Sequence, residues 1–265
     1  MRAVTSTSWS AGRYQAVAER IAGIADEVVD AAARRRPLRD AALVDLACGT
    51  GNAALSAAAR GAHVTGVDIT TELMAIGAHR DGGAAVTWVA ADAADTGLPD
   101  RSFDVAVSNM GIVFVEPNAQ IAEVTRLLRP GGVLAFSTWV RGDTNPLYDP
   151  IVSVLGAPPD TGYTPDQWGR PDLATARLDA DFDDVAFDAG VHTWRFDSHE
   201  AAMRFISEES PMHLGVLARV PSAREPLLAA FGEAMATHLD DRGGVSFEAP
   251  YAVISAVRSG DDHRA

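Results

Sequence analysis

The sequence of 265 residues contains no lysine, so all 22 of its basic residues are arginines. Without a lysine amine, the chain cannot form a Schiff base with a substrate or use a lysine as a general base. Its single cysteine, Cys48, excludes a disulfide within the chain and is typical of a reducing compartment. The sequence also lacks an apolar run long enough for a signal peptide or a transmembrane helix. We therefore expect a cytoplasmic protein without membrane attachment.

Basic residues are scarce compared with acidic ones. The chain has 36 Asp and Glu residues against 22 basic residues, which gives a formal charge of −14. Proteins that bind nucleic acids or anionic membranes need basic surfaces that pair with phosphate groups. The charge therefore argues against both kinds of partner. With 47% hydrophobic and 22% charged residues, the composition is that of a folded globular protein.

Apolar residues recur at steps of three and four between Tyr14 and Val28, a spacing that predicts one amphipathic helix. Three consecutive arginines at 34–36 complement the negative end of its dipole, and Pro37 discourages continuation. We therefore expect one N-terminal helix within residues 1–36.

Strand and helix patterns alternate in the next hundred residues. Strands are expected at 43–46, 63–67, 86–90, 103–107 and 133–139, with helices at 53–60, 71–79 and 119–128. Two further strands, at 185–196 and 250–257, enclose helical patterns at 200–206 and 221–239. This order predicts an α/β fold: a Rossmann-like, doubly wound, mostly parallel seven-stranded sheet with a helical cap insertion near the C-terminus. Ligands of such sheets bind beyond the carboxyl ends of the strands, where the strand order reverses.

A glycine-rich turn follows the first predicted strand. Residues 43–52 read LVDLACGTGN, which places Asp45 near the strand end and Gly49 and Gly51 before the next helix. With Ala54, the glycines fit the G-x-G-x-x-G/A spacing of dinucleotide-binding turns, and Asp68 lies about 20 residues further on, where a ribose-binding acid is expected. The turn alone therefore suits either a nicotinamide dinucleotide or S-adenosyl-L-methionine.

Asp45 favours the second ligand. A dinucleotide places its pyrophosphate against such a turn, where a carboxylate would repel it. S-adenosyl-L-methionine has no phosphate and carries an ammonium and a sulfonium, so an acid can hold its methionine part. Asp68 can accept hydrogen bonds from both ribose hydroxyls, and Asp92, after the third strand, can accept one from the adenine amino group.

The sequence resembles the class I S-adenosylmethionine-dependent methyltransferases, most closely the small-molecule branch similar to ubiquinone and menaquinone methyltransferases. Beyond the turn, the resemblance rests on GVD at 66–68, ADA at 91–93, LPDRSFDVAVSN at 98–109 and EVTRLLRPGG at 123–132. It implies S-adenosyl-L-methionine as the cofactor and S-adenosyl-L-homocysteine as the product. The cofactor-binding residues that it implies are Tyr14, Asp45, Ala47, Gly49, Gly51, Asp68, Ile69, Asp92, Ala93 and Asn109.

The resemblance also assigns these residues to parts of the cofactor. The turn residues surround the methionine part, Asp68 and Ile69 the ribose, and Asp92 and Ala93 the adenine, while Asn109 faces cofactor and substrate. The N-terminal helix is similar to the family's lid, from which Tyr14 reaches the cofactor. The chain then divides into a lid helix (1–36), a cofactor-binding core (37–141), and a substrate cap with the remaining strands (142–265).

Methyl transfer is an in-line displacement that depends on alignment and water exclusion more than on a strong acid. A base is needed only if the acceptor must lose a proton. His213, in the presumed cap, is the candidate catalytic residue, although an exposed histidine without a catalytic role fits the same sequence. Trp139, Trp168 and Met212 could line an apolar acceptor pocket or belong to the core. No metal-ligand cluster is recognisable, so no metal is expected.

We predict that the protein methylates a small-molecule substrate on oxygen, nitrogen or carbon. SNMG at 108–111 lacks the Asn-Pro-Pro-aromatic signature of enzymes that methylate amino groups of nucleic acids, in agreement with the acidic charge. One alternative is a protein of the same fold that binds the cofactor without methyl transfer, as a pericyclase or regulator. Another is an NAD-dependent oxidoreductase, against which Asp45 argues. The motifs identify neither the acceptor nor the oligomeric state.

Overall fold

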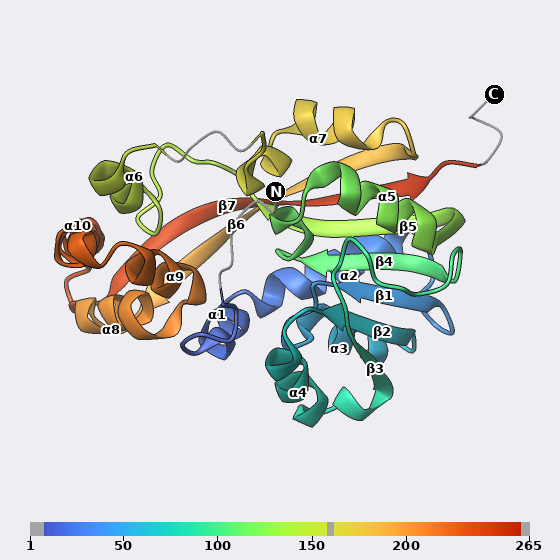
Figure 1. The fold of residues 1–265 in the computed structure, drawn as a ribbon, viewed down its shortest axis with the longest axis horizontal. Coiled ribbons are helices and arrows are strands. Elements are labelled where there is room, and N and C mark those ends of the chain that lie inside the picture. Colours follow the sequence, from blue (N-terminus) through green and yellow to red (C-terminus); the bar gives the residue numbers. More distant parts are fainter. Residues whose placement is uncertain (1–7, 158–161, 261–265) are drawn as a thin grey trace. The chain divides into compact units, whose positions relative to one another are not determined.

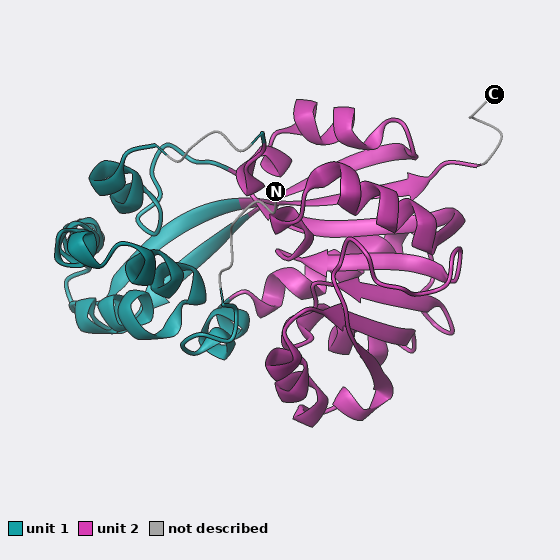
Figure 2. Ribbon diagram, viewed as in Figure 1, with its two compact units in different colours: residues 1–20, 141–162, 191–250 teal, residues 21–140, 163–190, 251–265 magenta. Residues whose placement is uncertain are grey.

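The computed structural model describes residues 8–157 and 162–260 (Figure 1). The chain folds into two compact units, coloured separately in Figure 2. Unit 1 comprises residues 1–20, 141–162 and 191–250, and unit 2 comprises residues 21–140, 163–190 and 251–265. Each unit therefore gathers three segments that are separated in the sequence.

One seven-stranded sheet has the strand order β3-β2-β1-β4-β5-β7-β6. The strands are β1 (Ala42–Leu46), β2 (His63–Asp68), β3 (Val86–Ala90), β4 (Phe103–Asn109), β5 (Leu128–Trp139), β6 (Phe182–Phe196) and β7 (Val245–Arg258). Strands β1 to β5 pair in parallel, and β7 pairs antiparallel with β5. The strand order reverses between β1 and β4. The predicted Rossmann-like, mostly parallel sheet is therefore confirmed.

Helices cover both faces of the parallel strands in unit 2. They are α2 (Ala22–Arg35), α3 (Asn52–Ala59), α4 (Thr71–His79), α5 (Pro117–Leu127) and α7 (Pro171–Leu178). The connections through α3 and α5 progress in opposite directions along the sheet, so right-handed crossovers place these two helices on opposite faces (Figure 1). The core between helices and sheet includes Val44, Leu46, Phe136 and Leu127, which are 0% exposed.

The N-terminal segment forms two helices, and the single helix predicted for it is wrong. Helix α1 (Tyr14–Arg20) and α2 are separated by Ile21, whose φ of −101° and ψ of 11° lie outside the helical region. Helix α1 belongs to unit 1, whereas α2 packs in unit 2 with Val28 and Val29 fully buried. Helix α2 is therefore a layer of the sheet domain.

Unit 1 is mainly helical. It contains α6 (Asp149–Leu155), α8 (His199–Arg204), the π-helical turn η4 (Phe205–Glu209), α9 (Pro211–Arg219) and α10 (Arg224–Ala236). The elements from α8 to α10 lie between β6 and β7 in the sequence, as predicted for the insertion. Helix α1 is attached to η4 in this unit, since Arg13 Nη1 lies 3.3 Å from Glu209 Oε1 and the Arg20 guanidinium lies 5.1 Å from the Phe205 ring centroid.

Short 3₁₀ turns lie between the helices and strands: η1 (Gly83–Ala85), η2 (Ile112–Phe114), η3 (Pro165–Gly169) and η5 (Pro221–Ala223). Of these, η2 directly follows the carboxyl end of β4, and η3 packs against β5.

Candidate functional site

The predicted site residues fall into two groups. All except Tyr14 and His213 lie in unit 2, in or just after the last residues of β1, β2, β3 and β4: Asp45, Ala47, Gly49, Gly51, Asp68, Ile69, Asp92, Ala93 and Asn109. Because these strands are parallel, their carboxyl ends meet at one edge of the sheet. Tyr14 begins α1, and His213 is in α9, both in unit 1.

Asp45 is buried with one carboxylate oxygen unused. It is 1% exposed, and its Oδ2 accepts the Ala54 N–H at 2.8 Å. Its Oδ1 is buried and has no hydrogen-bond partner among the described residues. Burial raises the pKa of Asp45 to about 8; the bond from Ala54 opposes this shift, and the charge of Asp68 adds to it. A buried acceptor without a partner is unfavourable by roughly 1–3 kcal/mol, so this oxygen marks a place for a donor or a cation.

The Asp68 carboxylate joins β2 to the glycine-rich turn. Its Oδ2 accepts the Gly49 N–H at 2.7 Å, and its Oδ1 accepts the Thr70 N–H at 2.8 Å. Each carboxylate oxygen has two lone pairs, so both can accept a further hydrogen bond from a ligand. In the turn, Ala47 has a φ of +53°, which is uncommon for a residue with a side chain and typical of functional sites.

Gly51 makes room for Trp88, a residue that the sequence analysis missed. A Cβ on Gly51 would lie 2.4 Å from the Trp88 ring, and one on Gly77 would lie 2.6 Å from it. A Cβ on Gly66 would lie 3.2 Å from the same ring. The indole therefore occupies a slot between three glycines of the turn, β2 and α4. No local pattern in the sequence signals this packing, because the glycines belong to different elements.

Three predicted site residues follow β2 and β3: Ile69, Asp92 and Ala93. Asp92 is exposed, and its Oδ1 accepts the Ala94 N–H at 2.9 Å. Ala93 is buried, and its carbonyl accepts a bond from Gln120 Nε2 at 3.2 Å. Ile69, after β2, is 70% exposed, an unusual position for a large apolar side chain. Such a side chain suits contact with a flat, partly apolar ligand.

Helix α5 holds the loop that follows Ala93. Glu123 Oε1 accepts the Thr96 N–H at 2.9 Å and the Thr96 hydroxyl at 2.6 Å. Arg126 donates to Glu123 Oε1 at 2.7 Å and to the Leu98 carbonyl at 2.6 Å. Burial alone would raise the pKa of Glu123, but its bonds from Arg126 and Thr96 outweigh burial and lower it. This role of Glu123 was not predicted, although the three-residue spacing of Glu123 and Arg126 on a helix signals such a pair.

Asn109 ends β4, and its amide is bound within unit 2. Its Oδ1 accepts the Ser137 hydroxyl at 2.8 Å, and its Nδ2 lies 3.4 Å from the Ile21 carbonyl. These contacts fix the amide at the carboxyl end of the strand. Its role toward a ligand stays a prediction.

His213 is buried, and the alternative of an exposed histidine is wrong. The side chain is 1% exposed and packs against the Phe231 ring, with centroids 5.3 Å apart. Its Nε2 lies 2.8 Å from the Leu147 carbonyl, and its Nδ1 lies 2.7 Å from the Ser210 hydroxyl. A carbonyl only accepts, so Nε2 donates to Leu147 and Nδ1 accepts from Ser210. Burial lowers the pKa of His213 to about 4. Both nitrogens are thus engaged within unit 1, and the role of His213 as a base stays a prediction.

The remaining candidate residues differ in how much of each side chain is buried. Trp168 is 1% exposed and packs edge-on against Phe136, with centroids 5.2 Å apart, so it belongs to the core. Trp139 is partly buried and packs edge-on against Tyr251. Met212 is 38% exposed, and Tyr14 packs edge-on against Trp9. Of these, Met212, Tyr14 and Trp139 keep surface that a ligand could reach.

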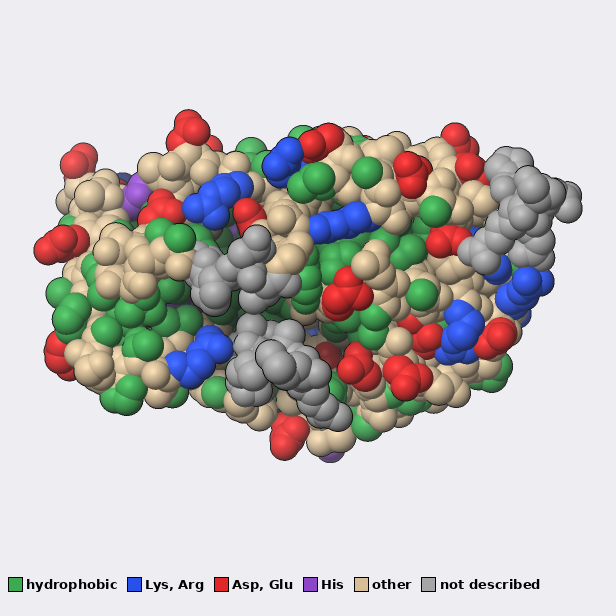
Figure 3. Space-filling view, turned by 45° about the horizontal axis from the view of Figure 1, so that its top comes forward, with side chains coloured by type: hydrophobic (Ala, Val, Ile, Leu, Met, Phe, Trp, Pro, Cys, Tyr) green, Lys and Arg blue, Asp and Glu red, His purple; other side chains and the backbone are tan. Residues whose placement is uncertain are grey.

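Three features concern the expected partners: the charge of the surface, the length of the helices and the grouping of possible metal ligands. On the face shown in Figure 3, acidic and basic side chains are interspersed with apolar ones. Among the helices described, none combines the length and the apolar composition needed to cross a lipid bilayer. Within residues 8–157 and 162–260, no three His, Cys, Asp or Glu side chains form a group suited to a metal ion.

Comparison with known families bears directly on this strand-end site. Residues 44–136 match the family described as a methyltransferase domain. This part of the chain is therefore similar to methyltransferase domains. The predicted resemblance is thereby confirmed. The chain is 37% identical over 107 residues to a demethylmenaquinone methyltransferase of Clavibacter sepedonicus, a match that covers 38% of this chain and 44% of that relative. The chain thus spans less than half the length of the curated relatives it matches first.

Solved structures share the fold of this chain. Phosphoethanolamine N-methyltransferase 2 of Haemonchus contortus, in complex with S-adenosyl-L-methionine, has a TM-score of 0.53 at 18% identity, covering 89% of this chain and 53% of that one. The [4+2]-cyclase SpnF has a TM-score of 0.50 at 21% identity, covering 88% of this chain and 81% of that one. At these identities the likeness shows the fold alone.

Proposed function

We propose that this protein binds S-adenosyl-L-methionine and transfers its methyl group to a small molecule. The observation that carries the proposal is the buried Asp45 Oδ1, which lies beside a glycine-rich turn and has no hydrogen-bond partner among the described residues. The methionine part of this cofactor carries an ammonium and a sulfonium, which a carboxylate attracts. The pyrophosphate of a dinucleotide would be repelled from the same place.

The other strand-end residues fit the rest of the cofactor. The unused lone pairs of Asp68 suit the two ribose hydroxyls, and the exposed Ile69 offers apolar contact beside them. Asp92 and Ala93 suit the adenine, and their loop is fixed by the bond that Gln120 donates and the bond that Glu123 accepts. When bound, the cofactor supplies an electrophilic methyl group on sulfur. The residues of this chain bind it, orient it and keep water from it.

The buried His213 indicates how the reaction proceeds on the protein side. Because both of its nitrogens are engaged, we propose that this enzyme aligns its acceptor and does not rely on His213 to deprotonate it. Alignment of two reactants supplies effective molarities of about 10⁵ to 10⁸ M, equivalent to roughly 7–11 kcal/mol of the barrier. The name of the Clavibacter relative favours a hydroxylated or quinone-like acceptor. Methylation on oxygen, nitrogen or carbon fits this proposal, as does a cytoplasmic location.

Calorimetry with three ligands tests the cofactor. We expect S-adenosyl-L-methionine and S-adenosyl-L-homocysteine to bind, and NAD not to bind. Tight binding of NAD alone would replace the proposal with that of an oxidoreductase.

Substitution of Asp68 tests the ribose site. We expect Asp68→Ala to weaken binding of S-adenosyl-L-homocysteine at least tenfold, because hydrogen bonds to a charged acceptor contribute about 1.5–3 kcal/mol each. Asp68→Asn keeps the shape of the side chain and should lower this affinity less. Asp81→Ala, which removes an exposed carboxylate from the same unit, is the control. Since Asp68 also bonds Gly49 and Thr70, circular dichroism must show an unchanged fold; equal affinity in all variants would mean that the ribose lies elsewhere.

A cyclase without methyl transfer is the second candidate function, because SpnF shares the fold. Incubation with methyl-labelled S-adenosyl-L-methionine and a metabolite extract separates the two. A methyltransferase gives a labelled small molecule. A cyclase binds the cofactor in calorimetry but gives no labelled product.

A further inference from the structure

Two buried serines hold the segment that follows β4. Ser108, in β4, and Ser137, in β5, are both 0% exposed. Residues 110–112, which leave β4 and begin η2, are called the β4 loop below. A serine hydroxyl donates one hydrogen bond and can also accept, so each of these side chains can join two parts of the structure.

Ser108 joins the β4 loop to β1. Its Oγ donates to the Leu46 carbonyl at 2.7 Å and accepts the Ile112 N–H at 3.0 Å. Leu46 is the last residue of β1, directly before the glycine-rich turn. The hydroxyl therefore ties the β4 loop to the strand that carries this turn.

Ser137 joins the β4 loop to β5. Its Oγ donates to Asn109 Oδ1 at 2.8 Å and accepts the Met110 N–H at 2.9 Å. Met110 has a φ of +58°, in the left-handed region that a residue with a side chain rarely adopts. Such a backbone persists only where its surroundings hold it. The hydroxyl thus fixes both the Asn109 amide and the strained residue after it.

The β4 loop also touches the glycine-rich turn directly. A Cβ on Gly111 would lie 2.6 Å from the Ala47 carbonyl oxygen and 2.7 Å from the Ala47 Cβ. Ala47 has a φ of +53°, so two strained segments meet at this contact. The contact prevents the β4 loop and the turn from approaching further, and the bond from Ser108 to Leu46 prevents them from separating.

This fixed spacing matters for the proposed methyl transfer. A lone pair of the acceptor forms the bond to the methyl carbon while the electron pair of the C–S bond returns to sulfur, so these atoms must lie in line. A misplacement of about 1 Å can lower such a rate about 100-fold. The turn is the candidate place for the methionine part of the cofactor, and Asn109 is the residue predicted to face both cofactor and substrate.

We propose that Ser108 and Ser137 are positioning residues for methyl transfer, whose hydroxyls keep the β4 loop and Asn109 at a fixed place relative to the cofactor turn. This role rests on the proposed function. Neither serine is among the candidate cofactor-binding residues. Loss of either hydroxyl should therefore lower the rate of transfer much more than the affinity for the cofactor.

Ser108→Ala and Ser137→Ala test the proposal on the full chain. With saturating methyl-labelled S-adenosyl-L-methionine and a metabolite extract as the source of acceptor, we expect the initial rate of label transfer to fall about tenfold or more in each variant. The dissociation constant for S-adenosyl-L-homocysteine, measured by calorimetry, should change roughly threefold or less. Because both serines hold one loop, the double variant should lose less than the product of the two single losses.

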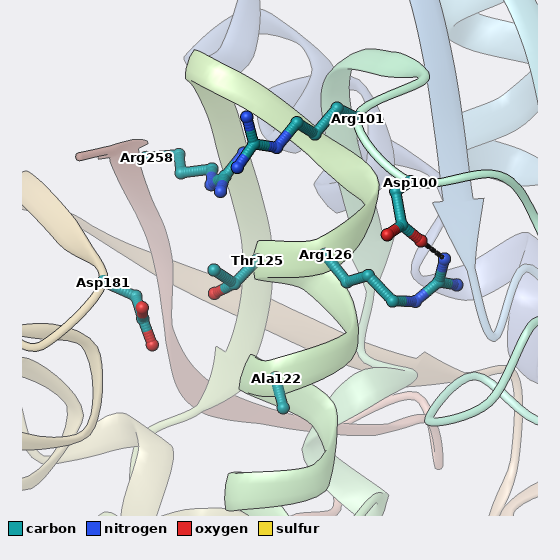
Figure 4. Close-up of a pocket in the computed structure, with 7 residues that line it drawn as sticks. All are labelled: Asp100, Arg101, Ala122, Thr125, Arg126, Asp181 and Arg258. Carbon is teal, nitrogen blue, oxygen red and sulfur yellow. Dashed lines mark hydrogen bonds and ion pairs between the residues drawn. The ribbon is translucent and has the colours of Figure 1, made fainter. Parts of the chain in front are cut away.

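Thr125→Val is the matched control, because it removes a buried hydroxyl that has no hydrogen-bond partner among the described residues. Thr125 is directed from α5 into a pocket at the opposite end of β4 from the strand-end site (Figure 4). We expect this variant to transfer label and to bind S-adenosyl-L-homocysteine as the parent does.

Urea unfolding of every variant gives the folded fraction under assay conditions, so that each rate is expressed per folded molecule. Ser108→Cys and Ser137→Cys nearly keep the size of the side chain with a much weaker hydrogen-bonding group, and they replace an alanine variant that does not fold. The same loss of rate is expected in them.

Three results would overturn the positioning role. Parental rates per folded molecule in both serine variants would leave the serines with a structural role alone. An equal loss of rate and of affinity would mean that the serines act on cofactor binding. If the parent protein itself transfers no label, the proposed function fails and the positioning role fails with it, whereas the first two results leave the proposed function standing.

Discussion

The charge of Asp45 depends strongly on its surroundings. With its pKa raised to about 8 by burial, the carboxyl is mostly protonated at neutral pH when no cation is beside it. A bound ammonium or sulfonium would favour the ionised form, so binding of the cofactor should release a proton.

The affinity of the protein for S-adenosyl-L-methionine should therefore rise by about tenfold per pH unit between about pH 5.5 and 7. Over this range the cofactor's ammonium stays charged, because α-amino groups titrate near 8. Calorimetry in two buffers with different ionisation enthalpies measures the released proton. In Asp45→Asn both the proton release and the pH dependence should disappear. An affinity of the parent protein that is constant over this range would show that Asp45 does not carry charge toward the cofactor.

For single residues, the sequence predicted those at the strand ends but did not predict tertiary contacts. The positions of Asp45, Asp68 and Asp92 follow from the alternation of strands and helices, because parallel strands end at one edge. The burial of His213 was not predicted, because its partner Leu147 lies 66 residues away and nothing near His213 signals the contact.

At the scale of elements, boundaries were harder to predict than element types. The apolar spacing of residues 14–28 continues across Ile21, but the backbone leaves the helical region there and divides the segment into α1 and α2. Three helices that begin with proline at their first or second position, α6, α7 and α9, had no definite prediction. Proline fits the first turn of a helix because the amide it lacks would have no partner there. Pro150, Pro171 and Pro211 therefore mark the starts of helices, although proline inside a helix interrupts it.

The packing of α4 against Trp88 gives a prediction about stability. A glycine-to-alanine change within a helix usually stabilises it by about 1 kcal/mol. In Gly77→Ala, however, the new Cβ would lie 2.6 Å from the Trp88 ring and 3.0 Å from the Thr50 carbonyl. We expect a net destabilisation of about 1–2 kcal/mol, because overpacking in a core outweighs helix propensity. Urea unfolding measures the free energy.

Two further variants make this comparison specific. Gly23→Ala in α2 has open space around the new Cβ and should be neutral or stabilising. In the background of Trp88→Leu, Gly77→Ala should be less destabilising, with a coupling of about 0.5–3 kcal/mol between neighbours. If Gly77→Ala stabilised the protein as Gly23→Ala does, the Trp88 indole would not pack against Gly77 as described.

At the scale of the whole molecule, two buried groups should shape stability against pH in opposite ways. Asp45 has a raised pKa, so its contribution is present below about pH 4 and is lost as the pH rises toward 8. His213 has a pKa lowered to about 4 against 6.5 for an ordinary histidine. The unfolded chain therefore binds the extra proton, and stability is lost as the pH falls from 6.5 toward 4.

His213→Gln isolates the second effect, because an amide does not titrate. Between pH 7 and 5 the free energy of unfolding of the parent should fall by about 2 kcal/mol more than that of the variant, since one pKa unit corresponds to about 1.4 kcal/mol. Urea unfolding at both pH values measures the difference. Parallel pH profiles would show that His213 titrates normally and is more accessible than the fold indicates.

Consecutive segments of sequence do not map onto the two compact units, since each unit is assembled from three separated stretches. Reading the chain in order finds the strands, but the strand order within the sheet depends on pairings across long distances. The pairing of β5 with β7, more than a hundred residues apart, is such a case.

The place of β7 also bears on how the polypeptide is made. It stands between β5 and β6, so β6 has no neighbour in the sheet until residues 245–258 have left the ribosome. Until then the nascent chain exposes unpaired edges of β5 and β6, which attract other chains. Premature termination or proteolytic loss of this single strand should therefore yield insoluble protein even when every residue of the strand-end site has been synthesised.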